Sequence, residues 1–175
     1  MTTNTYSAPT KIFHWLTVIL LVTQYAVGWL MPGVHRGTLP VGLISWHVSI
    51  GAVILLLVLV RLVWHWIKPS PPPLQTVSPL LQKCARATHA LLYLLLVAFP
   101  LMGWANASVR GWSLTFFDLV PLPSLVPKGS PIGHAFGELH TPFAWVLCGV
   151  ITLHIMATLY HYLVVKDDSL RRMLA

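Results

Sequence analysis

Four long apolar segments constrain this chain more than any other feature of its sequence. A helix needs roughly 20 mostly apolar residues to cross a hydrocarbon core of about 30 Å. Four segments have that length, at residues 11–31, 41–66, 80–104 and 137–165. Only 9% of the 175 residues are Asp, Glu, Lys or Arg, against about 25% in soluble domains. We therefore predict an all-α, four-helix transmembrane bundle that forms a single domain over residues 1–175, rather than a soluble or nucleic-acid-binding protein.

The connections between these segments are rich in proline, which ends helices and stiffens short turns. The longest connection, residues 105–136, also contains an apolar stretch at residues 114–119. That stretch is too short to span a bilayer. We predict that it lies on the membrane surface.

The basic residues are unevenly divided between the two ends of the predicted bundle. Eight of the 11 lysines and arginines fall at the end that carries both termini, and three fall at the other. Cytoplasmic loops carry the excess of basic residues, so we predict that both termini are cytoplasmic. The eight are Lys11, Arg61, Lys68, Lys83, Arg86, Lys166, Arg171 and Arg172, and the three are Arg36, Arg110 and Lys128.

Nine histidines are unexpected in so apolar a chain. An ionisable side chain inside hydrocarbon is costly and therefore indicates a function. His35 and His134 fall in outer connections and His65 falls at an interface, so we expect these three in contact with water or headgroups. The other six lie within the predicted spans, and they are His14, His47, His89, His140, His154 and His161.

The depths of four of these histidines form two pairs. His140 and His154 are 14 residues apart, which places them on one helix face about 21 Å apart along the axis. His47 matches the depth of His140, and His14 matches the depth of His154. Two imidazoles from different helices at one depth suit the two axial positions of a haem iron.

Zinc, a proton relay and a haem-free transporter or scaffold are the alternatives. Zinc prefers four ligands, often cysteines, whereas each level here supplies two histidines and no thiolate. Membrane proton relays usually include Asp or Glu, and the first three spans contain neither.

Gly28 and Gly51 lie on the faces of His14 and His47, where they could open space for a macrocycle or serve ordinary helix packing.

Together these residues resemble the bacterial four-helix cytochrome b561 family, which is related to the cytochrome b subunits of nickel–iron hydrogenases and formate dehydrogenases. The matching segments are His14-Trp15, HVSIG at 47–51, THALLYLLLVAFPLMG at 88–103, and the stretch from His140 through LHIMATLYHYLVVKDDSLRRML. The resemblance implies two haem b groups, with His14 and His154 on the cytoplasmic haem and His47 and His140 on the outer one. The chain departs from the family at Thr141, where Glu is usual, and at Tyr162, where a second histidine is common.

The resemblance also implies a function in electron transfer. Electrons would pass between a donor at the outer face and the quinone pool, whether ubiquinone or menaquinone, in a bacterial inner membrane. Some members are reported as superoxide oxidases, and others are electron-transfer subunits of a larger hydrogenase or dehydrogenase. Both functions stay open at this point, and the catalytic residues are unknown.

Four further residues near the cytoplasmic end are candidates for cofactor binding. His161 follows His154 by 7 residues, so it would bind a haem propionate or a quinone carbonyl, or simply extend to water. His89 has the same possibilities. Arg61 and Lys166 could form charge-assisted bonds with propionates. At the other face, the rim of Arg36, Arg110 and Lys128 would attract a small anion such as superoxide.

Overall fold

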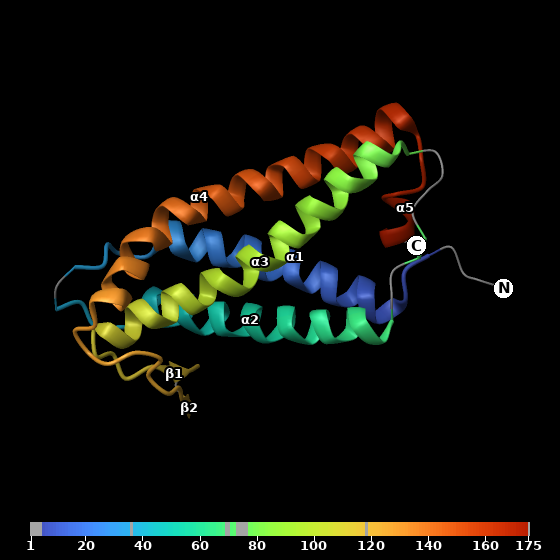
Figure 1. Ribbon diagram of the computed structural model, residues 1–175. Helices are drawn as coiled ribbons and strands as arrows, with labels where there is room; N and C mark the ends of the chain where they lie inside the picture. Colours follow the sequence, from blue (N-terminus) through green and yellow to red (C-terminus); the bar gives the residue numbers. More distant parts are fainter. Residues whose placement is uncertain (1–4, 36, 69–70, 73–76, 118, 175) are drawn as a thin grey trace.

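The computed structural model describes residues 5–35, 37–68, 71–72, 77–117 and 119–174. Four long helices form one bundle (Figure 1), and each is long and apolar enough to cross a membrane. This confirms the predicted four-helix transmembrane bundle. The long helices are α1 (Ala8–Leu30), α2 (Leu43–Ile67), α3 (Pro79–Val109) and α4 (Pro131–Tyr160). A π-helix, η1 (His161–Val165), continues α4, and the small elements are β1 (Thr115–Phe116), β2 (Val120–Pro121) and α5 (Arg171–Leu174).

A serine followed by a proline marks the start of both α3 and α4. Ser78 precedes Pro79, and its Oγ accepts a hydrogen bond from the backbone N–H of Leu81. Ser130 precedes Pro131 at the start of α4. Proline suits the first helical turn because its fixed φ matches the helix and its missing N–H would have no partner there. Consequently α4 begins at Pro131, six residues before the start of the predicted span at residue 137.

The two ends of the bundle differ in what they carry. Both chain termini and the α2–α3 connection lie at one end, which we call the terminal end (Figure 1). The hairpin of β1 and β2 and the other two connections lie at the opposite end (Figure 1). The termini therefore share one end, as an even number of spans requires. The cytoplasmic location of that end stays a prediction from the basic residues.

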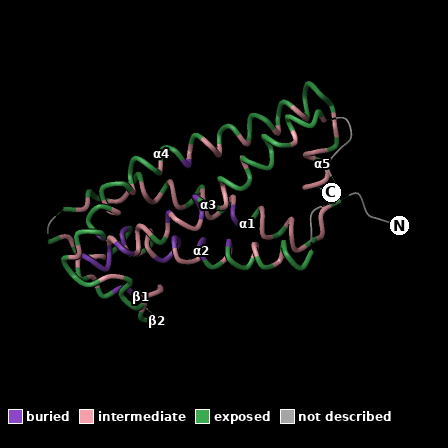
Figure 2. The backbone as a smooth tube through the Cα atoms, viewed as in Figure 1, coloured by how far each residue is buried: buried purple, intermediate pink, exposed green. Residues whose placement is uncertain are grey.

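The helices pack as two pairs. α1 lies mainly against α2, α3 lies against α4, and contacts between α2 and α3 join the pairs. Most buried residues lie on α2 and α3, towards the opposite end (Figure 2). α1 and α4 have few buried residues, namely Thr17 on α1 and Gly133 and Leu147 on α4, as expected for helices that face lipid tails. The core consists of Ile50, Ile54, Val58, Leu95, Leu96 and Leu147.

The apolar stretch 114–119 folds back on the bundle through the hairpin. β1 pairs with β2 in antiparallel register, with Phe116 opposite Val120. Leu114 is buried, and the backbone N–H of Phe117 donates to the buried hydroxyl of Ser49 on α2. The stretch therefore covers the opposite end of α2. Its location on a membrane surface stays a prediction.

Candidate functional site

Three imidazoles meet inside the terminal half of the bundle. His14 on α1 and His154 on α4 have ring centroids 6.4 Å apart. His89 on α3 lies beside them, with its centroid 5.1 Å from that of His154. We call these three residues the terminal layer. Sequence periodicity predicted the neighbours His14 and His154, but it placed His89 nearer the terminal end, at the depth of His161.

Arg61 brings α2 into the terminal layer. Its Nη2 lies 3.0 Å from Nδ1 of His14, and its guanidinium stands 5.4 Å from the ring centroid of Tyr93. Because arginine stays protonated, Nδ1 of His14 accepts this hydrogen bond. The Nε of Arg61 is buried without a hydrogen-bond partner among the described residues. A cation with a spare donor therefore points into the layer.

A second pair of imidazoles lies nearer the opposite end. His47 on α2 and His140 on α4 have ring centroids 6.2 Å apart, and we call this pair the opposite layer. Phe99 packs against His140 at 4.8 Å between ring centroids. Gln24 on α1 donates to the backbone oxygen of His47 at 3.0 Å and lies 3.3 Å from its Nε2. Sequence reasoning missed Gln24 as a site residue, although an amide in an apolar span was a usable signal.

Glycines make room beside the opposite layer. A Cβ on Gly28 would lie 3.3 Å from Cε1 of His47, and one on Gly103 would lie 3.0 Å from Cε1 of His140. Both distances are shorter than ordinary carbon–carbon contacts of about 3.5–4.0 Å. Gly51 faces Gln24 instead, at 3.4 Å from its Nε2. Gly28, which was predicted to lie on the face of His14 but at the other end of that helix, therefore lies against His47.

The two layers suit a metal that brings its own equatorial ligands. Two imidazoles that bind one metal from opposite sides have ring centres roughly 6 Å apart, since each metal–nitrogen bond is about 2 Å, and both pairs match this. Nδ1 of His47 and of His140 are buried without partners among the described residues, which is uncommon for buried polar atoms. Within that same part of the chain, no three His, Cys, Asp or Glu side chains group as a metal site. Paired histidines thus fit haem better than a metal held by protein ligands alone.

His161 lies outside both layers, at the rim of the terminal end. It begins η1, and its Nδ1 is 2.6 Å from Oδ2 of Asp167. Burial acts to raise the pKa of Asp167, but hydrogen bonds from Ser169 and His161 outweigh it and hold the pKa below its usual value. Lys166 ends η1 with φ 56° and has an exposed side chain. The His161–Asp167 pair was missed from sequence because it depends on this left-handed turn.

The remaining predicted positions are peripheral. The side chains of His35, His65 and His134 are exposed, as expected. His134 belongs to the first turns of α4 and not to a connection. Arg110 donates to the backbone oxygen of His35 at the opposite end. Arg36, which was predicted to belong to the positive rim, lies outside the described residues.

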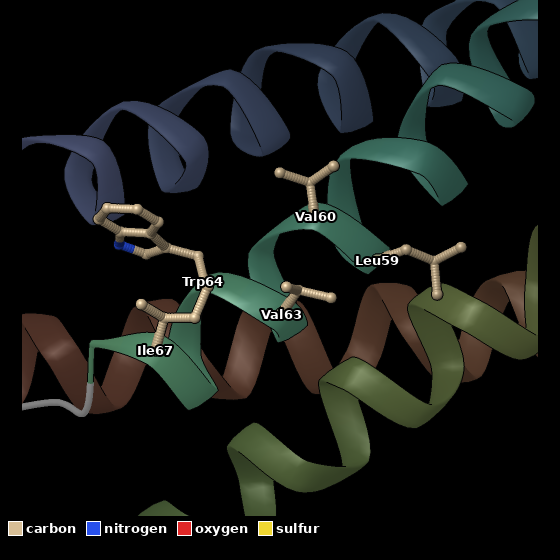
Figure 3. Close-up of a pocket in the computed structure, with 5 residues that line it drawn as sticks. All are labelled: Leu59, Val60, Val63, Trp64 and Ile67. Atoms are coloured by element: carbon tan, nitrogen blue, oxygen red, sulfur yellow. The ribbon is translucent and has the colours of Figure 1, made fainter.

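A shallow apolar hollow on α2 is separate from the histidines. It is lined by Leu59, Val60, Val63, Trp64 and Ile67, which occupy one face near the terminal end of the helix (Figure 3). The indole N–H of Trp64 donates to the hydroxyl of Thr10 on α1. An apolar hollow of this kind at membrane depth suits lipid tails, so we assign it no part in the site.

The sequence relatives agree with this geometry. A model of the prokaryotic cytochrome b561 family matches residues 5–175. The chain is 31% identical to cytochrome b561 homolog 2 of Escherichia coli (strain K12), over 98% of this chain and 94% of that protein. It is 31% identical to the probable superoxide oxidase CybB of Yersinia pestis, over 92% of this chain and 90% of that protein. It is 29% identical to cytochrome b561 homolog 1 of E. coli (strain K12), over 98% and 97%. The chain therefore belongs to the prokaryotic cytochrome b561 family, whose members are membrane cytochromes that bind haem b.

Proposed function

We propose that the protein carries electrons across a bacterial inner membrane through two haem b groups, one in each histidine layer. His14 and His154 would hold the haem in the terminal layer, and His47 and His140 would hold the haem in the opposite layer. The observation that carries this proposal is the pair of ring separations, 6.4 Å and 6.2 Å, in the two halves of one bundle.

The haem iron supplies a reversible one-electron couple, and the surrounding residues tune it. Gly28 and Gly103 keep the helices free of side chains beside His47 and His140, and Gly51 leaves room beside Gln24. If Nε2 of His14 held the haem iron, Nδ1 would carry the ring proton and could not accept from Arg61. The guanidinium of Arg61 would then be free to bind a haem propionate. His89 lies close enough to the same pair to share that role.

The proposed direction of electron transfer rests on the cations at the opposite end and on His161 at the terminal end. With the terminal end in the cytoplasm, a donor would approach the opposite end, where Arg110 and Lys128 are exposed or half-exposed cations. One relative is named a probable superoxide oxidase, and superoxide is a small anion that such cations attract. At the terminal end, Oδ2 of Asp167 accepts from Nδ1 of His161, which leaves Nε2 of the neutral imidazole as an acceptor for the hydroxyl of a quinol, the reduced product. The activity we propose is therefore superoxide-to-quinone or a related quinone-linked electron transfer.

Haem stoichiometry is the first test. The purified protein should show a reversible reduced-minus-oxidised b-type spectrum and two haems per chain. One haem per chain would contradict the two-layer assignment. A protein that never binds haem would contradict the proposal altogether.

The electron donor is tested separately. Rapid mixing of the oxidised holoprotein with superoxide should reduce the haems, and added ubiquinone should reoxidise them. Haems that stay oxidised with superoxide would exclude it as donor. Reduction only in the presence of a co-purifying dehydrogenase or hydrogenase subunit would instead identify the chain as a subunit of a larger complex.

A further inference from the structure

The terminal end of α4 carries a hollow beside the His161–Asp167 pair. Its volume is about 310 Å³, and it lies where η1 gives way to the segment before α5. The left-handed backbone of Lys166 reverses the chain there, and its N–H bonds the carbonyl of His161. α5 is tucked beneath the end of α4 at the terminal end (Figure 1). The hollow is lined by Tyr162, Leu163, Lys166, Asp167 and Arg171.

The charge that this hollow presents is positive. Lys166 and Arg171 are its two cations, and Nζ of Lys166 has no hydrogen-bond acceptor among the described residues. The carboxylate of Asp167 is turned inward with only 4% of its side chain exposed, where it accepts bonds from His161 and from the backbone N–H of Ser169. Arg171 meets Asp168 at 3.6 Å in a highly exposed pair, which is weak in water. An anion in the hollow would therefore meet two available cations.

An apolar path leads from this hollow into the membrane. Leu163 lines the hollow, and Leu159 and Met156 lie one and two turns before it on the same side of the helix. Their exposed fractions are 62%, 40% and 59%. These side chains offer an apolar surface that a free phosphate ion would leave uncovered. The ligand that matches the hollow is therefore an anion with an attached acyl chain.

We propose that this hollow binds the phosphate headgroup of an anionic phospholipid, with one acyl chain lying along Leu163, Leu159 and Met156. Lys166 and Arg171 neutralise the phosphate, as basic residues do at the cytoplasmic membrane surface. Tyr162 lies at headgroup level, where tyrosine is favoured. The site is independent of the haems, because none of the four proposed axial ligands lines it.

Lipid retention tests the site directly. The intact protein in detergent is incubated with equimolar dioleoyl phosphatidylglycerol and dioleoyl phosphatidylcholine, and bound lipid is counted by native mass spectrometry. We expect one phosphatidylglycerol adduct, retained about tenfold more than phosphatidylcholine. Equal retention of the two lipids would overturn the proposal without any variant having to fold.

A charge-matched pair of variants locates the site. Lys166→Gln with Arg171→Gln should lower phosphatidylglycerol retention to the phosphatidylcholine level. Lys83→Gln with Arg86→Gln removes the same two charges from exposed positions on α3 and should leave retention unchanged. Equal losses in both double variants would mean general surface attraction and would refute the site. Displacement by inorganic phosphate alone, or a retained quinone in place of phospholipid, would also refute it.

Discussion

The two histidine layers contain the same kind of imidazole pair in very different surroundings. The terminal layer adds a third imidazole and the buried guanidinium of Arg61. The opposite layer adds an uncharged amide, an aromatic ring and two glycines in close approach. A nearby positive charge stabilises an added electron. The difference therefore favours electrons at the terminal layer, which agrees with transfer towards the quinone proposed there.

The largest expected effect comes from removing one proposed ligand of the opposite layer. His140→Ala should reduce the haem content from two to one per chain and leave the terminal-layer spectrum in place. His134→Ala is the matched control, because His134 lies on the same helix with an exposed side chain. Retention of both haems in His140→Ala would contradict the assignment of His140 as a haem ligand of the opposite layer.

Replacing Gly103, which packs closely against His140 in the opposite layer, should have the next largest effect. In Gly103→Ala the new methyl group meets Cε1 of His140 at 3.0 Å, and such overpacking typically costs about 1–3 kcal/mol. We expect lower haem occupancy and a lower unfolding temperature in detergent. Gly149→Ala is the control, since nothing lies within 4 Å of its Cβ position and alanine favours the helix by up to about 1 kcal/mol. Equal effects at the two positions would argue against a packed site at Gly103.

The charge of Arg61 should separate the electron affinities of the two layers. Arg61→Gln should lower one of the two midpoint potentials by about 50–100 mV, the effect of a unit charge roughly 10 Å away in a medium of effective dielectric about 20. A potentiometric titration of the haem spectrum measures this. Gln24→Leu, in the opposite layer, should leave the midpoint potential that Arg61→Gln lowers unchanged. If Arg61→Gln moved both potentials equally, the two layers would not differ in the way described.

The smallest effect concerns the rim beyond the terminal layer. Asp167 has a pKa held below its usual value, so its interactions stabilise the fold above pH about 4 and are lost as the pH falls through that lowered pKa. Asp167→Asn should therefore lower stability by about 1 kcal/mol near neutral pH and flatten its decline in acid. Thermal unfolding in detergent at several pH values tests this, with the exposed Asp168→Asn as control. An unchanged acid profile in Asp167→Asn would exclude this stabilising role.

Sequence periodicity was enough to find the spans and to place the histidines in two neighbouring pairs. That success has a simple cause, because depth and helical phase are both set by residue number along a regular helix. The role of these histidines as ligands stays a prediction. The contact of Gln24 with His47 was missed because it depends on how neighbouring helices are rotated.

Irregular backbone explains the other differences between expectation and structure. The bond between Asp167 and His161 requires a π-helix and a left-handed Lys166, and periodicity describes neither. α4 begins at Pro131, before the predicted span, because its first turns contain glycine and histidine among the apolar residues. The hairpin at β1 and β2 forms where hydrophobicity alone had suggested a surface segment.

The pairing of α1 with α2 and of α3 with α4 has a consequence for how the protein is made. The first hairpin leaves the ribosome with His14 and His47, and the second follows with His140 and His154. Neither hairpin holds both members of a proposed ligand pair, so under the proposed assignment the nascent chain would have no place to capture a haem until its halves meet in the membrane. Each captured haem would then bridge the two halves, so cofactor insertion and the closing of the bundle become a single assembly step.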